Sequence, residues 1–169
     1  MKTSGFGAKM LTNPSAFDIQ TNSLVTVNES GTITLHAVKE EGITQLRSFD
    51  LNGISSLDFN GLHIVYGQTD GRMDLLNILS ETPKCVKIGS ESIDKVMVTF
   101  DDKVLSWSSG AGDLKLWDMD GLLESNENEG VAEEKAGNSG EICDVTDVGA
   151  VAFTPTSKDV VLGECVQIT

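Results

Sequence analysis

The side chains that most often carry out chemistry are few and scattered in this sequence. No Cys-x-x-Cys pair is present, and no histidine has carboxylate or thiol neighbours at the spacing of a metal site or an activated nucleophile. We therefore expect no catalytic residue, no metal site and no cofactor. An odd number of widely spaced cysteines is typical of reduced thiols rather than of a disulfide framework. The histidines and cysteines are His36, His63, Cys85, Cys143 and Cys165.

Two ligand-binding motifs begin in the sequence and are not completed. The run from Ser48 to Gly53 is similar to the start of a calcium loop, but the last position of such a loop falls on Phe59, where a bidentate glutamate is required. No Gly-x-x-x-x-Gly-Lys-Ser/Thr string is present either. The sequence therefore predicts neither a calcium site nor a phosphate-binding loop.

Charge and apolar content limit the partners of the chain. Its 169 residues carry a net charge of −14, which disfavours direct binding of nucleic acid because phosphates would be repelled. Apolar runs are far shorter than the roughly 20 residues that span a bilayer. The first residues lack the apolar stretch of a secretory signal. We expect no membrane association and a cytoplasmic or nuclear protein.

A repeat with a period of about 40 residues organises the chain. In residues 24–31, 64–71 and 104–112, a run typical of a strand leads into a glycine, and the third copy has one extra residue. Residues 32–37, 72–77 and 113–118 follow with apolar side chains two apart, which is typical of strands with two distinct faces. Each unit therefore predicts a β-hairpin closed by a glycine turn.

Further strands flank the predicted hairpins. One lies upstream, at residues 16–19, 56–59 and 96–100, and another lies downstream, at residues 43–47 and 84–88. Four strands at this period are typical of a propeller blade. A fourth unit begins near residue 148, and the sequence ends within it. The prediction is an all-β chain that forms a partial β-propeller of about three and a half four-stranded blades.

An acidic segment interrupts the third unit. Residues 122–141 hold six glutamates and one lysine among Asn, Ser and Gly, too few apolar groups to offset the entropy of ordering. We expect a flexible loop there. Either residues 142–145 supply the missing fourth strand, which we favour, or the unit lacks it. The predicted organisation is an N-terminal segment (1–14), blades one to three (15–121), the acidic loop (122–141), and the end of the third blade with an incomplete fourth (142–169).

The third unit resembles the hairpin of WD-repeat proteins, which ends in a Trp-Asp pair, here Trp117 and Asp118. The fourth unit is similar to the preceding strand pair of that family, with Phe-x-Pro at residues 153–155. The Gly-His dipeptide of the family is absent, and the Trp slot holds His36 in the first unit and Leu76 in the second. The His-Asp-Ser-Trp network characteristic of the family is therefore incomplete, and we expect apolar packing in its place.

The resemblance implies an interaction scaffold within a multiprotein assembly. In the proteins this chain resembles, the turns between the second and third strands lie on one face with the loops that link blades, and that face commonly docks peptides or domains. Alternatively, these residues merely close tight turns. Trp107 and Trp117 lie in predicted strands, so we expect them to pack rather than to anchor a ligand. The implied binding residues are Asn28, Glu29, Ser30, Gln68, Thr69, Asp70, Arg72, Ser108, Ser109 and Asp113.

Two other interpretations stay open. One is an enzyme on a propeller with a site in its central channel, where Asp18 and Asp58 would lie on innermost strands. The other is a truncated fragment without independent activity. An open arc would leave two apolar sheet faces uncovered, and the missing burial would rival the stability of a whole domain. A protein partner that completes the propeller, or self-association, would cover those faces.

Overall fold

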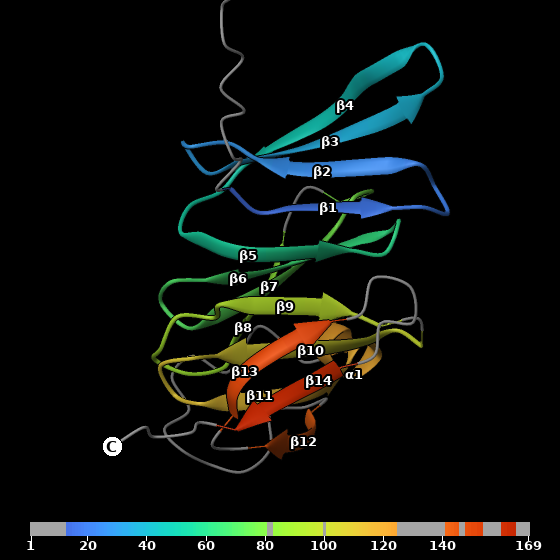
Figure 1. Ribbon diagram of the computed structural model, residues 1–169. Coiled ribbons are helices and arrows are strands. Elements are labelled where there is room, and N and C mark those ends of the chain that lie inside the picture. The colour runs from blue at the N-terminus through green and yellow to red at the C-terminus, as the bar shows by residue number, and fades with distance from the viewer. Residues whose placement is uncertain are drawn as a thin grey trace, which may run out of the picture.

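The computed structural model describes residues 13–80, 83–99 and 101–124, together with the backbone of residues 141–145, 148–153 and 160–164. Fourteen strands and one short helix are assigned within these ranges (Figure 1). The prediction of an all-β chain is confirmed. No helix in the described ranges has the length and apolar character needed to cross a bilayer.

The strands form consecutive antiparallel sheets in which sequence neighbours pair. Three sheets have four strands each, and a two-stranded hairpin follows them. The first sheet holds β1 (Ser15–Asp18), β2 (Ser23–Val27), β3 (Thr32–Lys39) and β4 (Gly42–Asp50). The second holds β5 (Ile54–Phe59), β6 (His63–Gln68), β7 (Arg72–Asn77) and β8 (Lys84–Lys87). The third holds β9 (Lys95–Val98), β10 (Lys103–Ser108), β11 (Asp113–Asp118) and β12 (Glu141–Val145), and the hairpin holds β13 (Val148–Phe153) and β14 (Val160–Glu164).

Glycines close the three central hairpins at equivalent positions. Gly31, Gly71 and Gly112 all have positive φ, at 88°, 82° and 71°. Residues with a Cβ rarely adopt this left-handed conformation, so glycine is the residue that these turns require. The repeated glycines of the sequence therefore correspond to a shared backbone geometry.

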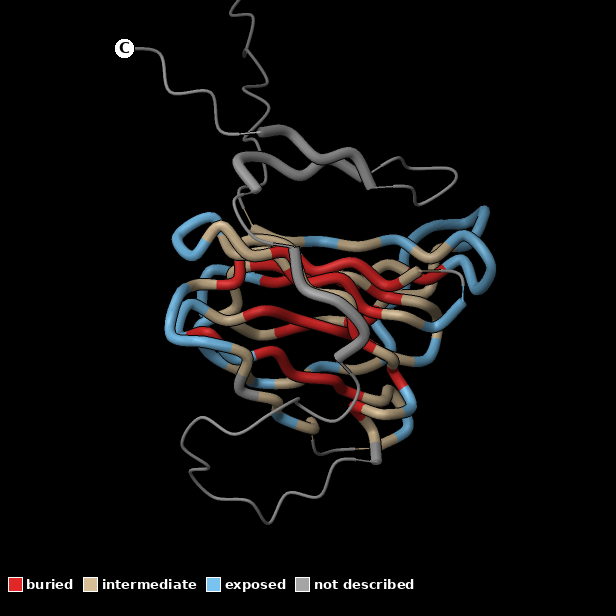
Figure 2. Tube along the Cα trace, turned by 90° about the horizontal axis from the view of Figure 1, so that it is seen from below, coloured by how far each residue is buried: buried red, intermediate tan, exposed pale blue. Residues whose placement is uncertain are grey.

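The three sheets pack face to face, and the middle sheet contributes to two clusters. Alternate residues of β6 point in opposite directions, as the strand period requires. Ile64 and Tyr66 join a cluster with Val25 and Ile33 of the first sheet, whereas Val65 joins a cluster with residues of the third sheet. Buried positions run along the middle of the strands and exposed positions lie at their two ends (Figure 2). Both ends of the strands therefore present turns to solvent.

The fourth strand of the third sheet comes from beyond the acidic segment. β12 pairs with β11 in antiparallel register, with a shift between Leu116 and Trp117. This is the favoured one of the two alternatives, in which residues 142–145 supply the missing strand.

The expectation of a flexible loop that starts at Leu122 is wrong at its first residues. Met119–Glu124 form a short helix, α1, and Leu122 is fully buried against the second and third sheets. The helix continues from β11, and the Asp118 carboxylate accepts a hydrogen bond from the Gly121 backbone N–H at 3.1 Å. The apolar pair Leu122 and Leu123 is thus a part of the core. The rest of the predicted acidic loop, residues 125–140, lies outside the described residues.

The face of the first sheet that points away from the second carries both polar and apolar side chains. Val25 and Ile33 point toward the second sheet, so their strand neighbours Thr26 and Thr34 point away from it. His36 shares that outer face and lies 3.1 Å from the Thr26 hydroxyl through its Nε2 atom. The outer face therefore combines hydroxyls and an imidazole with apolar side chains such as Phe17, which pairs with Leu24 and is 52% exposed.

Candidate partner-binding face

The predicted binding residues lie at one end of the strands. The β2–β3, β6–β7 and β10–β11 turns gather at the left of Figure 1, together with the connections that join one sheet to the next. Hydrogen bonds link the turns to these connections: Thr69 N–H donates to the Gly53 carbonyl at 2.9 Å, and Ile93 N–H donates to the Gln68 carbonyl at 3.1 Å. We call this surface the turn face, comprising residues 28–31, 51–53, 68–72, 88–94 and 108–113.

In the first turn, the side chains of Asn28 and Ser30 hold the turn itself. The Asn28 Oδ1 atom accepts hydrogen bonds from Ser30 N–H at 3.0 Å, from the Ser30 hydroxyl at 2.7 Å and from Thr32 N–H at 2.9 Å. Glu29, at the tip, is exposed. Asn28 and Ser30 therefore have a turn-closing role, and Glu29 offers its carboxylate on the surface.

In the second turn, an ion pair lies on the surface. The Arg72 Nε atom is 3.1 Å from Asp70 Oδ2, and both side chains are about half exposed, at 51% and 50%. Asp70 Oδ1 also accepts a hydrogen bond from Arg72 N–H at 3.2 Å. Gln68 differs, because its amide donates inward to the buried Asp74 carboxylate at 2.5 Å. Thr69 is exposed. Asp70, Arg72 and Thr69 thus present polar groups to solvent, whereas the Gln68 amide points to the interior.

In the third turn, Ser109 binds the connection that enters the third sheet. The Asp94 carboxylate accepts hydrogen bonds from the Ser109 N–H at 2.8 Å and from the Ser109 hydroxyl. Ser108 and Asp113 are half-buried at the ends of β10 and β11 and pair with each other across the hairpin. Ser109 therefore fixes the turn, and Ser108 and Asp113 lie at its base.

The connection between the second and third sheets is tied closely to the second turn. The Gly71 carbonyl accepts hydrogen bonds from Ile88 N–H at 3.1 Å and from Gly89 N–H at 3.2 Å. A Cβ at Gly71 would lie 2.3 Å from the Gly89 carbonyl oxygen, so only glycine allows this approach. The Ile93 carbonyl in turn accepts from the hydroxyls of Ser55, at 2.5 Å, and Ser56, at 3.1 Å.

A cavity of about 170 Å³ lies between this connection and the β10–β11 hairpin. Two of the predicted residues, Ser108 and Asp113, line it. Trp107 also borders it, but its side chain packs with Met97, Leu105 and Leu114, which agrees with the expectation that it packs rather than anchors a ligand. Sequence reasoning missed the walls from the connection, because nothing in the repeat marks them. The lining residues are Ile88, Gly89, Ser90, Glu91, Ile93, Ser106, Trp107, Ser108, Ala111, Asp113 and Lys115.

The two aspartates considered for a central channel have structural partners. Asp18 Oδ2 accepts from the Thr21 N–H at 2.8 Å and from the Thr21 hydroxyl at 2.5 Å. Asp58 Oδ2 accepts from Val98 N–H at 2.8 Å, which joins the second sheet to the third. In the described ranges, no three His, Cys, Asp or Glu side chains lie close enough together to hold a metal ion.

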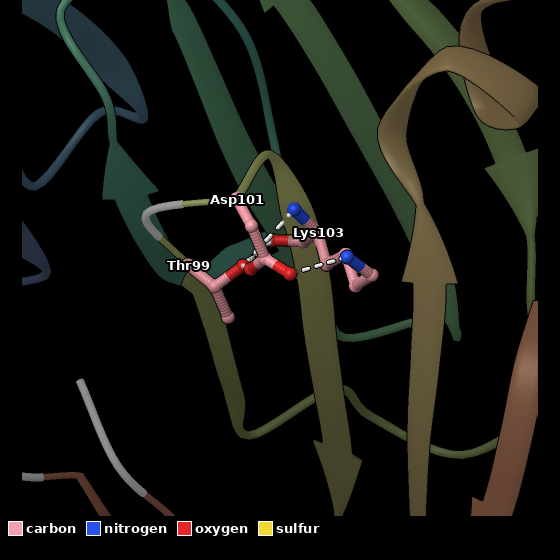
Figure 3. A network of polar contacts seen from close by, with 3 residues as sticks. All are labelled: Thr99, Asp101 and Lys103. Carbon is pink, nitrogen blue, oxygen red and sulfur yellow. Dashed lines mark hydrogen bonds and ion pairs between the residues drawn. The ribbon is translucent and has the colours of Figure 1, made fainter.

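The opposite end of the third sheet carries a polar network of its own (Figure 3). The Thr99 hydroxyl donates to Asp101 Oδ1 at 2.6 Å and accepts from Lys103 N–H at 3.0 Å, while the Lys103 ammonium pairs with the Asp101 carboxylate. These hydrogen bonds, first that from Lys103 and then that from Thr99, lower the pKa of Asp101 to about 2. This exposed acid–base pair across a turn matches the Asp70–Arg72 pair and lies at the other end of the strands.

A third polar cluster lies across three strands of the second sheet, with Asp74 and Tyr66 buried and Cys85 at the exposed edge. Asp74 is buried opposite Tyr66 on β6 and opposite Cys85 on β8. Loss of solvation, and then the Asp74 carboxylate, raise the pKa of the Cys85 thiol to about 11, and the same two causes raise the pKa of the Tyr66 hydroxyl above its usual range. Both groups therefore stay protonated at neutral pH, which is the opposite of an activated nucleophile.

Comparison with known proteins adds information about the fold alone. No protein-family model matches the chain, and no curated protein is similar to it in sequence. Among solved structures, the chain is similar to the crystal structure of the computationally designed Ika8 protein, with a TM-score of 0.58 and 20% sequence identity. The match covers 88% of this chain and 42% of the designed one. The chain thus spans less than half the length of that protein.

Proposed function

We propose that this chain is a non-enzymatic protein–protein interaction scaffold of WD-repeat type, acting in a multiprotein assembly. The observation that carries the proposal is the turn face. It gathers three turns and two inter-sheet connections at one end of the strands, and hydrogen bonds hold them in place. Such a surface offers fixed loop positions that a partner can recognise without chemistry at the site.

The finer fold within this proposal is a partial β-propeller of about three and a half blades. Three consecutive four-stranded sheets packed face to face support it. So does the Trp117 indole, which donates to the Ser106 hydroxyl at 2.9 Å and supplies the Ser–Trp half of the network characteristic of WD repeats. His36 and Thr26 occupy the equivalent positions of the first sheet, 3.1 Å apart.

The partner in this proposal is a protein, and the compartment is cytoplasmic or nuclear. The net charge of −14 favours a partner surface with basic residues over a nucleic acid. A partner or a second copy of the chain that completes the propeller belongs to the same proposal. No observation specifically favours an enzyme, since Asp18 and Asp58 both bind backbone or hydroxyl groups of the fold.

The test exchanges charges within one exposed pair at each end of the strands. Asp70→Arg with Arg72→Asp keeps an ion pair in the β6–β7 turn but reverses the pattern that a partner would meet. The matched control is Asp101→Lys with Lys103→Asp, since that pair also spans two residues across a turn. Each variant serves as bait in a quantitative pull-down, with recovered proteins measured by mass spectrometry.

We expect the exchange on the turn face to lower recovery of the specific partners by about tenfold, because like charges would then face each other. The exchange at the opposite end should leave recovery unchanged. Equal recovery with all baits would remove the turn face from the proposal and leave residues 68–72 with a turn-closing role alone.

A further inference from the structure

The outer face of the first sheet leaves apolar side chains open to solvent. Phe17 on β1 is 52% exposed, and Ile43 on β4 is 63% exposed. Leu24 and Val38 are their strand partners and share the face. By strand alternation, the other members of the face are Ser15, Thr26, Thr32, Thr34, His36, Gln45, Ser48 and Asp50. Exposed apolar side chains that gather on one face are typical of a protein interface.

The same positions are buried in the other two sheets. One apolar pair joins the first two strands of each sheet at the same register, namely Phe17–Leu24, Phe59–Ile64 and Val98–Val104. In the second and third sheets, no member of these pairs is more than 2% exposed, because the preceding sheet covers it. No sheet of the described residues precedes the first one. The outer face therefore resembles an inter-sheet face that lacks its cover.

The polar residues at the centre of the outer face have partners within the sheet. The His36 Nε2 atom lies 3.1 Å from the Thr26 hydroxyl. The equivalent pair in the third sheet, Trp117 and Ser106, is bonded at 2.9 Å, and both residues are at most 3% exposed. A polar pair that is already bonded costs little to bury. The hydroxyls and the imidazole are therefore compatible with cover by another sheet.

Charge is nearly absent from the outer face. Asp50, at the end of β4, is the one charged residue that the strand pairing places there, whereas 22% of the whole chain is charged. The cores of protein interfaces are depleted of charged residues in the same way. The acidic residues that give the chain its net charge of −14 are almost all outside this face.

Two observations favour a second copy of the chain as the cover. The hairpin β13–β14 lies at the opposite end of the molecule from β1–β4, so it cannot cover the outer face of its own copy (Figure 1). The fold match to the designed protein extends over 88% of this chain but only 42% of the designed one. Two copies would therefore span about 84% of such a fold, and a third copy would exceed its length.

We propose that the outer face of the first sheet binds the hairpin β13–β14 of a second copy, so that two copies close head to tail into one ring of sheets. Within the chain, the equivalent face of each sheet is covered by the preceding unit, and β13–β14 is the last unit described. Each copy thus offers its first sheet to one contact and its last hairpin to the other. The inference rests on the proposed partial propeller and names its partner.

The association should be weak. A two-stranded hairpin with six residues per strand covers ~10 Å by ~20 Å, or ~200 Å² on each of the two surfaces. Two such contacts bury ~800 Å² in total, which is the range of weak and transient interfaces. We therefore expect a dissociation constant of about 10–100 μM. Dilute protein should be monomeric, with its outer face open.

Sedimentation velocity tests the proposal with the full chain. Protein concentrations from about 1 to about 500 μM bracket the expected dissociation constant, and one copy has a mass of 18.0 kDa. Salt at about 0.15 M screens repulsion beyond about 8 Å. Phe17→Asp places a carboxylate in the contact. The matched control is Leu79→Asp, since Leu79 is also exposed, at 79%, but follows β7 and lies outside the outer face.

We expect the mass of the unchanged chain and of Leu79→Asp to rise with concentration toward two copies and no further. Phe17→Asp should raise the dissociation constant by about tenfold or more, because a charge within the contact would have no partner. Far-UV circular dichroism checks that both variants are folded. Hydrogen exchange of concentrated samples locates the second surface: amides of β13 and β14 should exchange faster in Phe17→Asp than in Leu79→Asp.

A chain that stays monomeric at every concentration, or that forms assemblies larger than two copies, would overturn the inference. Equal association of the two variants would do the same. Faster exchange in the first sheet alone would mean that two outer faces meet, which contradicts the head-to-tail arrangement. Failure of the scaffold proposal is a separate outcome. If the Asp70 and Arg72 exchange lowers partner recovery while the chain stays monomeric, the turn face remains an interaction surface without a ring of two copies.

Discussion

The first and third sheets hold different side chains at equivalent positions, and what covers each position explains the difference. In the third sheet, Trp117 is fully buried in the cluster shared with the second sheet. In the second sheet, Leu76 takes this position and is fully buried against the first sheet. In the first sheet, His36 takes it and is only half-buried, with no cluster of the described residues on its side.

The repeat thus determines the backbone conformation of each hairpin, whereas the type of side chain at this position depends on whether a neighbouring sheet covers it. All three residues pair with the same position of the preceding strand, forty residues apart from one sheet to the next: Leu24, Ile64 and Val104. Where a sheet packs on the position, a large apolar group is favoured by its burial. Where none does, an imidazole bonded to Thr26 tolerates water.

The largest expected effect comes from truncation of the covered residue. Trp117→Ala should lower the free energy of unfolding by about 3–5 kcal/mol, since it leaves a cavity between two sheets and deprives Ser106 of its donor. His36→Ala, the matched change at the open end, should cost less than about 1 kcal/mol. Urea denaturation followed by circular dichroism measures both.

Similar losses of unfolding free energy in Trp117→Ala and His36→Ala in dilute solution would contradict this difference between the third and first sheets. They would mean that the outer face of the first sheet is as well covered as the inner faces, for instance by a second copy of the chain. Repeating the measurement at several protein concentrations separates these cases, because a covering copy makes the stability depend on concentration.

A smaller effect is expected from substitution of two glycines, one covered by neighbouring backbone and the other open to solvent. Gly71 and Gly42 both have positive φ, at 82° and 140°. A Cβ at Gly71 would meet the backbone of the connection, whereas a Cβ at Gly42 would meet nothing within 4 Å. Gly71→Ala should therefore cost about 2–4 kcal/mol and Gly42→Ala about 1 kcal/mol, from backbone strain alone.

Thermal or chemical denaturation of the two glycine variants checks this prediction. Equal costs at the two positions would show that the connection yields to an added methyl group.

Much of the local structure could be predicted from the sequence, because it is encoded by neighbours in the chain. The alternation of apolar residues and the glycines at 31, 71 and 112 marked the hairpins. These local signals carry no information about contacts between sheets. Leu122 follows a strand and precedes an acidic run, so composition assigned it to a loop, although its side chain is buried against the second and third sheets.

The candidate site was predictable in part for the same reason. Ser108 and Asp113 could be found because they flank a turn that the repeat defines. Glu91 and Ile93 could not, since the connection that contains them repeats no pattern and acquires its role by lying on another unit.

The smallest expected effect concerns His63, at the start of β6. Here burial affects the protonation of a side chain rather than its size. Burial lowers the pKa of His63 below its ordinary value of 6.5, against the opposing influence of Asp102 and then Asp120. Its Nε2 atom lies 3.2 Å from the Asn77 amide nitrogen, which suits a neutral ring that accepts from Asn77. The folded state therefore binds a proton less readily than the unfolded chain does.

Because the pKa of His63 is lower in the folded state than in the unfolded chain, the free energy of unfolding should rise with pH. The contribution of neutral His63 is fully present above pH 6.5, is lost as the pH falls through 6.5 toward the lowered folded pKa, and changes no further below it. His63→Gln keeps a group that can accept from Asn77 but cannot titrate, so its unfolding free energy should depend less on pH in this window. Urea titrations at a series of pH values measure the slope. If the pH dependence of the unfolding free energy is the same in His63→Gln as in the unchanged chain, His63 is as hydrated in the folded state as in the unfolded chain. The neighbouring sheet would then not shield the start of β6 from water.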